Sequence, residues 1–232
     1  MSVVLASELS AKYAQWGISD TLTDLVRNFG DRIAFSSSFG QEDQVITHEI
    51  FANNIPIRVF TLDTGRLFQE TYDVFASTSD KYGKRIEVYF PEAKSVEAMV
   101  QAKGPNSFYF SVENRKECCN IRKIEPLERA LQGASIWITG LRGSQSANRS
   151  SMALFEWDER FKLVKYNPLI RWSLEEVVQY LEAYNVPQNA LHKKGFVSIG
   201  CAPCTIATPD TDDIRAGRWW WEQSHKECGL HS

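Results

Sequence analysis

The stretch RIAFSSSFGQEDQVITHEI, residues 32–50, joins a short apolar run to a segment with helical periodicity through a loop rich in serine and glycine. Further apolar runs at residues 55–63, 85–90 and 134–141 alternate with amphipathic segments of helical length. This alternation is typical of β-α-β units, and it predicts an α/β fold with a mainly parallel sheet and helices on both faces. Ligands of such sheets bind beyond the carboxyl ends of the strands, so the loops after the strands are the candidate sites.

The remainder of the chain is less regular. Residues 153–169 indicate two short strands joined by a charged turn, and residues 173–185 a helix that begins with a Ser173/Glu176 capping box. Residues 200–232 show no clear period and contain three of the five cysteines. We find no internal repeat. We therefore predict one domain over residues 1–232, with a nucleotide-binding α/β core at about 20–200 and a C-terminal segment at 201–232.

Composition excludes several classes of protein. The chain has 232 residues, 43% of them apolar, which is enough for a sizeable core. A net charge of −3 provides no global positive field, so we expect neither nucleic acid nor a membrane surface as partner. No apolar run approaches the roughly 20 residues of a membrane-spanning helix, and the first residues lack the pattern of a signal peptide. We expect a cytoplasmic protein.

Three loops after predicted strands could hold an anion. Ser36–Ser38 and Gly40 lead into a helix, whose N-terminal N–H groups suit a phosphate, although a serine-rich turn can also be an ordinary helix cap. Asp63–Arg66 follows the second strand, and the loop at residues 139–150 contains two arginines, whose guanidinium groups can pair with phosphate or sulfate oxygens. Together the loops predict one polyanionic ligand, a nucleotide.

Four cysteines form two local groups. Cys201 and Cys204 make a C-x-x-C unit, and the adjacent Cys118 and Cys119 precede it by about eighty residues. Four thiolates fit a structural zinc ion or an iron–sulfur cluster. Neighbouring side chains on a helix diverge by about 100°, which suits two irons of a cluster better than one small ion. A dithiol redox pair at the C-x-x-C unit would leave the other two cysteines unexplained.

The fifth cysteine, Cys228, stands apart near the C-terminus, with Gly229 beside it and His225 and His231 three residues to either side. A lone thiol can act as a nucleophile when a nearby cation favours its thiolate form. Without a resolving cysteine of its own, it would need an external thiol to complete a reaction. The alternative is an inert tail cysteine.

Seven motifs together resemble a known family. They are SSSFGQED (36–43), LDTGR (62–66), KECCNIRK (116–123), TGLRGSQSANR (139–149), GCAPCT (200–205), RAGRWWWE (215–222) and ECGLH (227–231). In this order they resemble the assimilatory adenylyl-sulfate (APS) reductases, the cluster-bearing branch of the APS/PAPS reductase family, from about residue 33 to 231. The resemblance implies an adenine nucleotide α-hydrolase-like fold. It also implies reduction of adenylyl sulfate to sulfite and AMP, for cysteine biosynthesis, with reduced thioredoxin or a glutaredoxin-like protein as donor.

The resemblance also implies roles for single residues. Cys228 would be the catalytic nucleophile that forms a thiosulfonate with the sulfate sulfur. One [4Fe-4S] cluster per chain would be held by Cys118, Cys119, Cys201 and Cys204. The implied substrate-binding residues are Ser36, Ser37, Ser38, Phe39, Gly40, Asp43, Leu62, Asp63, Thr64, Gly65, Arg66, Lys123, Gly140, Arg142, Arg149, Arg215, Arg218 and His231. Lys123, Arg215, Arg218 and His231 match the positions that grip the phosphosulfate. The cluster could then act electrostatically, through the contact between Lys123 and sulfate.

Three other functions remain open, and a homo-oligomer is compatible with all of them. The first is the same chemistry on 3'-phosphoadenylyl sulfate (PAPS), although relatives that use this substrate mostly lack the four cluster cysteines. The second is an ATP pyrophosphatase, which typically has S-G-G-x-D-S where this chain has SSSFGQED. The third is a nucleotide-sensing module in which the four cysteines hold zinc, which metal analysis would distinguish from a cluster.

Overall fold

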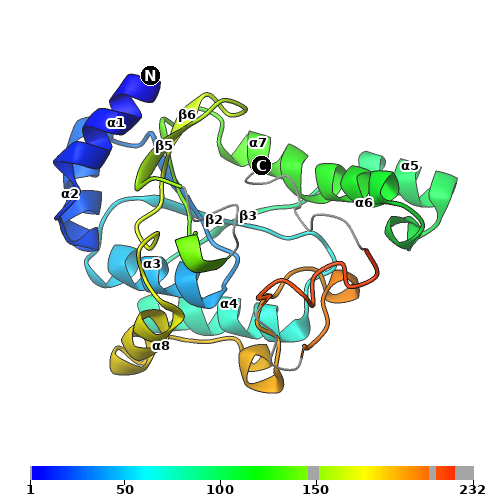
Figure 1. Ribbon diagram of the computed structural model, residues 1–232. Helices are drawn as coiled ribbons and strands as arrows, with labels where there is room; N and C mark the ends of the chain where they lie inside the picture. Colours follow the sequence, from blue (N-terminus) through cyan, green and yellow to red (C-terminus); the bar gives the residue numbers. More distant parts are fainter. Residues whose placement is uncertain (1, 146–151, 209–212, 223–232) are drawn as a thin grey trace. The chain divides into compact units, whose positions relative to one another are not determined.

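A computed structural model describes residues 2–145, 152–208 and 213–222 of the protein (Figure 1). The helices are α1 (Val3–Lys12), α2 (Ile18–Phe29), α3 (Gln41–Ala52), α4 (Gln69–Tyr82), α5 (Ala93–Lys103), α6 (Val112–Cys119), α7 (Glu125–Ala130) and α8 (Leu174–Ala183). The strands are β1 (Ile33–Ser36), β2 (Arg58–Leu62), β3 (Glu87–Tyr89), β4 (Ile136–Ile138), β5 (Phe155–Asp158) and β6 (Leu163–Tyr166). Within the described ranges, no helix combines the length and the apolar character that crossing a bilayer requires.

The six strands form one sheet in the order β3-β2-β1-β4-β6-β5. β1 pairs in parallel with β2 and β4, and β4 pairs in parallel with β6, whereas β5 runs antiparallel to β6. All three residues of β4 are buried, as expected for a central strand of a parallel sheet that is covered on both sides. The predicted α/β fold with a mainly parallel sheet is confirmed.

The chain divides into two compact units built from interleaved segments. The first unit comprises Met1–Thr61, Gln69–Glu87 and Gly133–Ala190, and the second comprises Leu62–Phe68, Val88–Gln132 and Leu191–Ser232. The C-terminal segment therefore belongs to the same unit as the tandem cysteines and the LDTGR motif.

The first unit has an apolar core to which helices and strands both contribute. On α2, Leu22 and Leu25 are fully buried, and the half-buried Val26 packs against the same core, so one face of the helix is apolar. The helix ends at Gly30, whose φ of 61° lies in the left-handed region that favours glycine. Helix α8 begins with the predicted capping box: the Ser173 side chain accepts the Glu176 N–H, and the Glu176 carboxylate accepts the Ser173 N–H.

Among the elements that were not predicted from the sequence, two bear on the fold and the site. Helix α1 packs against β5, and its Ser10 hydroxyl is 3.0 Å from the Phe155 nitrogen and 3.1 Å from the Phe155 oxygen, so it binds both backbone groups. The second is a π-helical turn, Asn120–Ile124, which follows α6 directly after the tandem cysteines. Such turns are rare and are frequent at functional sites.

Candidate active site

In the first unit, the loop after β1 is fixed by hydrogen bonds of its own. The Ser37 N–H donates to the Phe60 carbonyl at 2.8 Å, and the Ser37 hydroxyl accepts the Phe39 N–H at 3.2 Å. Phe39 has a φ of 58°, and its buried ring stacks on Phe75 with centroids 4.9 Å apart. A bulky residue adopts such a φ only where the surroundings impose it, so this loop has one defined shape before any ligand binds.

Asp43 connects this loop with the one after β4. Its Oδ2 accepts the Ser38 N–H and the Ser38 hydroxyl, both at 2.6 Å. Gly140 lies so close that a methyl group at that position would overlap the Asp43 carboxylate. Burial raises the pKa of Asp43 to about 6, against the lowering influence of the bonds from Ser38. The first and third predicted loops therefore meet at Asp43, and Gly40 is the N-cap residue of α3 between them.

Arg142 is held by an acidic residue that the sequence analysis did not single out. Its Nε donates to Glu42 Oε1 at 2.7 Å, its Nη1 donates to Ser144 Oγ at 2.6 Å, and the guanidinium is almost fully buried. Gln145 Nε2 donates to the same Glu42 oxygen at 2.9 Å. The pair fixes the loop after β4 to the first turn of α3. Phosphate binding by Arg142 stays a prediction, and Arg149 lies outside the described residues.

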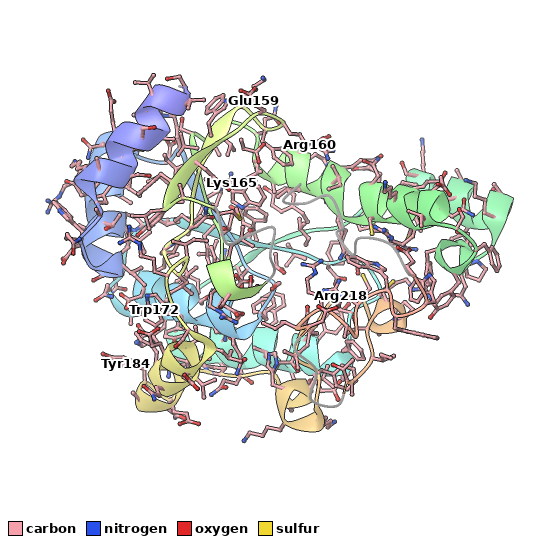
Figure 2. The ribbon with its side chains drawn as sticks, viewed as in Figure 1. Glu159, Arg160, Lys165, Trp172, Tyr184 and Arg218 are labelled. Carbon is pink, nitrogen blue, oxygen red and sulfur yellow. The ribbon has the colours of Figure 1, made fainter. Side chains whose placement is uncertain are left out.

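Ser36 is the last residue of β1, and its hydroxyl accepts the Trp137 indole N–H at 2.8 Å. Lys165 of β6 lies over the face of this indole, with its Nζ 5.4 Å from the ring centroid. The same Nζ is 2.6 Å from Asp158 Oδ2. Figure 2 labels Lys165 among the side chains of the sheet. Because the indole occupies one lone pair of the hydroxyl, the Ser36 O–H proton is directed elsewhere.

In the second unit, the LDTGR motif forms a compact turn after β2, which ends at Leu62. Asp63 Oδ1 accepts the Gly65 N–H at 2.8 Å, and Gly65 has a φ of 69°. The Arg66 guanidinium binds the 105–106 segment, with Nη1 at 2.5 Å from the Pro105 oxygen and Nη2 at 3.0 Å from Asn106 Oδ1. The Arg66 carbonyl accepts the Ala202 N–H at 2.8 Å, which joins this turn to the C-x-x-C unit.

The two cysteine groups line one cavity, which we call the thiol cavity. Cys118 and Cys119 end α6, Cys201 precedes the short turn Ala202–Cys204, and Cys204 is its last residue. All four are buried, and none takes part in a disulfide. The cavity is lined by these four cysteines and by Arg66, Phe108, Arg115, Arg122, Lys123, Pro203 and Trp219. Within the part of the chain that the structure describes, no three His, Cys, Asp or Glu side chains are grouped closely enough to hold a metal ion.

The thiol pKa values differ within the cavity. Burial raises the pKa of Cys118, and burial together with the other thiols raises that of Cys204 to about 12. At Cys201 burial is the largest single influence and by itself would raise the pKa. The net pKa is nevertheless below its ordinary value, because four groups lower it: Lys123, the Thr64 hydroxyl, Arg218 and Arg122. The Cys201 sulfur lies 3.3 Å from Thr64 Oγ1. This environment favours one thiolate over its neighbours.

Arg122 is a cation of the cavity that the sequence analysis missed. It lies in the π-helical turn, is 8% exposed, and donates from Nη1 to the Thr64 carbonyl at 2.6 Å. Its Nε is buried and has no hydrogen-bond acceptor among the described residues. A buried donor without an acceptor is costly, so a further anionic group in the cavity would be stabilised. Four thiols beside Arg122 and Lys123 fit an anionic cluster with thiolate ligands.

The C-terminal segment brings two predicted phosphosulfate ligands to the same unit. Arg218, labelled in Figure 2, and Arg215 lie over the Trp219 ring, with guanidinium carbons 4.8 and 5.6 Å from its centroid. Arg218 Nη1 donates to the Ile199 carbonyl at 3.3 Å. The catalytic candidate Cys228 and His231 lie outside the described residues.

Comparisons with known proteins agree with this arrangement. The family model for the phosphoadenosine phosphosulfate reductase domain matches residues 32–207 of the sequence. An adenosine 5'-phosphosulfate reductase of Burkholderia cepacia is 44% identical over 231 residues, which cover 99% of this chain and 91% of that protein. One of Allochromatium vinosum is 49% identical over 202 residues, which cover 87% of this chain and 79% of that protein.

Solved structures share the fold. A phosphoadenylyl-sulfate reductase from Candida auris, in a phosphate complex, superposes with a TM-score of 0.76 at 24% identity and covers 89% of this chain and 98% of its own. The FMN adenylyltransferase of Candida glabrata, in complex with ATP, gives a TM-score of 0.57 at 16% identity and covers 89% of this chain and 72% of its own. These likenesses confirm the predicted α/β fold.

Proposed function

Since the chain belongs to the phosphoadenosine phosphosulfate reductase domain family, we propose that it reduces adenylyl sulfate to sulfite and AMP in sulfate assimilation. The observation that carries the choice of substrate is the identity of 44 to 49% to proteins named adenosine 5'-phosphosulfate reductase. The thiol cavity supports the same choice, because the four cysteines are the feature that PAPS-specific relatives mostly lack.

We propose that Cys118, Cys119, Cys201 and Cys204 hold one [4Fe-4S] cluster. The support is the burial of all four thiols around one cavity and the Arg122 Nε that finds no acceptor among the described residues. Bound there, the cluster would supply a local charge beside Lys123, without exchanging electrons. Anaerobic purification followed by metal and sulfide analysis tests this proposal: iron with matching sulfide supports it, and zinc without sulfide would favour the nucleotide-sensing module.

In the proposed reaction, the Cys228 thiolate attacks the sulfur of adenylyl sulfate. A sulfur–sulfur bond forms, the bond from sulfur to the phosphate oxygen breaks, and AMP leaves with the electron pair of that bond. A thiolate of reduced thioredoxin then attacks the Cys228 sulfur and releases sulfite, and the second thioredoxin thiol resolves the mixed disulfide. The dithiol thus supplies the two electrons that convert sulfate to sulfite.

We propose that the polar loops stabilise AMP as the leaving group. In the first unit, Ser37 and Ser38 present a preformed loop at the start of α3, where backbone N–H groups suit the AMP phosphate. In the second unit, Lys123, Arg215 and Arg218 provide cations for the phosphosulfate, and His231 completes the set proposed from the motif match. Each of these assignments is a proposal that substitution of the single residue would test.

The same chemistry on PAPS is the second candidate, because the names of the matching family model and of the Candida auris enzyme both refer to PAPS as the substrate. One added phosphate requires only one more basic partner. The rates of the two substrates with the same enzyme preparation distinguish the candidates. We propose a cytoplasmic location for either activity, since it needs a reduced thiol donor.

Intact-mass analysis of the anaerobically purified protein tests the function. The protein is incubated with adenylyl sulfate, and separately with PAPS, without reductant. We expect an added SO₃ group that is absent from Cys228→Ser and disappears when thioredoxin is added. The substrate that gives the adduct faster identifies the specificity. Absence of an adduct with both substrates, from protein that contains its iron, would refute the proposed chemistry.

A further inference from the structure

The segment before the C-terminal tail is fixed to the C-x-x-C turn. The Trp219 N–H donates to the Cys204 carbonyl at 3.1 Å, the Ile206 N–H donates to the Gly217 carbonyl at 3.0 Å, and Thr205 forms a β-bridge with Arg218. A methyl group at Gly217 would overlap the Ile206 carbonyl. These contacts hold residues 217–219 in one register against the turn.

Glu222, the last residue described, is fixed by a second and different contact. Both of its carboxylate oxygens accept hydrogen bonds from Arg115, from Nε at 2.9 Å and from Nη2 at 2.9 Å. The side chains are only 1% and 5% exposed. Arg115 lies on α6, three residues before Cys118. A buried ion pair contributes little net stability, but its two parallel bonds define position and orientation closely.

Trp219 completes the contact. Its indole is 1% exposed, and the Arg115 guanidinium carbon lies 4.7 Å from the ring centroid, so one arginine binds both Trp219 and Glu222. Trp219 has a φ of 44°, a conformation that non-glycine residues adopt only under constraint. The turn from Trp219 to Glu222 is closed by a Glu222 N–H to Trp219 carbonyl bond of 2.8 Å.

We propose that the Arg115–Glu222 pair is the anchor from which the Cys228 tail acts, and that Arg115 is a positioning residue for the reaction. This inference rests on the proposed function. Cys228 is the sixth residue after Glu222, so even an extended chain keeps it within roughly 20 Å of the anchor. Fixing Glu222 therefore limits the volume that the Cys228 thiolate can reach and raises its effective concentration within that volume.

Single-turnover kinetics separate positioning from stability. At saturating adenylyl sulfate without reductant, the amplitude of adduct formation reports the folded, competent fraction, and the rate constant reports how often Cys228 reaches the sulfur. We expect Glu222→Gln to lower the rate constant by about 10- to 100-fold, with unchanged AMP affinity and iron content. Glu117→Gln is the matched control, because Glu117 lies on the same helix in the exposed ion pair with Lys103. It should stay within about twofold of wild type.

Arg115→Lys is the second variant, since it keeps the positive charge but loses the paired hydrogen bonds to Glu222. If Glu222→Gln does not fold, Arg115→Lys tests whether the pair positions Cys228. We expect a rate constant between those of wild type and Glu222→Gln. An unchanged rate constant in the folded variants, with any loss confined to the amplitude, would overturn the anchor. If the wild-type protein forms no adduct although AMP binds, the proposed function itself fails, which is a different result.

Discussion

Asp43 shows how much of this chemistry depends on single buried groups. Its carboxylate binds Ser38 through two short hydrogen bonds and packs against Gly140, so it holds together two loops proposed to bind AMP. Burial raises its pKa to about 6. In the folded protein this carboxyl therefore gains a proton just below neutral pH, whereas in the unfolded chain it would do so near 3.8.

This shift predicts a pH dependence of stability. Between pH 3.8 and about 6 the folded state binds a proton at Asp43 that the unfolded state does not, so the free energy of unfolding falls as pH rises through this window. The contribution of Asp43 should be on the order of 3 kcal/mol. Urea unfolding of wild type and Asp43→Asn from pH 4.5 to 7 measures it. Parallel curves for the two proteins would contradict the assignment.

At the scale of elements, α3, α4 and α8 meet around His48. His48 Nδ1 is 2.8 Å from the Tyr82 hydroxyl, and its ring packs on Tyr180 and Tyr184 with centroids 5.7 and 4.8 Å away. Tyr180 donates to Glu49 at 2.6 Å. Burial, and to a lesser degree Lys81, lowers the pKa of His48, so this junction is built for a neutral imidazole.

The junction should weaken in acid. Because the pKa of His48 is lower in the folded than in the unfolded state, the unfolded chain binds the extra proton first, and stability is lost as pH falls below 6.5. This sign is opposite to that of Asp43. Relative to wild type, His48→Gln should lose less unfolding free energy between pH 6.5 and 5. Equal losses in urea titrations of both proteins would rule out His48 as the cause.

Most elements could be predicted, because strands and amphipathic helices leave a periodic signal and the Ser173 capping box a local one. Helix α1 was missed, since only Ala6 and Leu9 are buried on it and its apolar pattern is weak. The sequence placed the four cysteines in two local groups, and these line one cavity in the structure, while their role as cluster ligands stays a prediction. The pairs Arg142–Glu42 and Arg115–Glu222 could not be predicted, because their members lie 100 and 107 residues apart and charged side chains carry no periodicity that indicates a partner.

At the scale of the whole molecule, the proposed cluster joins chain segments that belong to the second unit but lie far apart in sequence. Cys118 and Cys119 come from α6, and Cys201 and Cys204 from the turn that also fixes the C-terminal segment. A cluster bound to all four would therefore crosslink α6 to that turn, and its loss should loosen the second unit first.

Substitution of one ligand tests this crosslink. Cys204→Ser should bind less than half the iron of wild type and unfold at a temperature several degrees lower, since the remaining thiols are buried around an empty cavity. Cys228→Ser makes the same chemical change in the tail and should retain its iron. Iron analysis and thermal unfolding followed by circular dichroism measure both variants. Full iron content in Cys204→Ser would exclude this cysteine as a ligand.

The interleaved units have a consequence for biosynthesis. The chain passes from one unit to the other after residues 61, 68, 87, 132 and 190, so neither unit is a continuous stretch. During translation the tandem cysteines emerge about eighty residues before Cys201. Until Cys201 and Cys204 have been synthesised, Cys118 and Cys119 therefore lack the thiols with which they line the cavity. Delivery of iron and sulfide to the proposed cluster would accordingly follow synthesis of residue 204, and a chain truncated before that residue would lack one of the four proposed ligands.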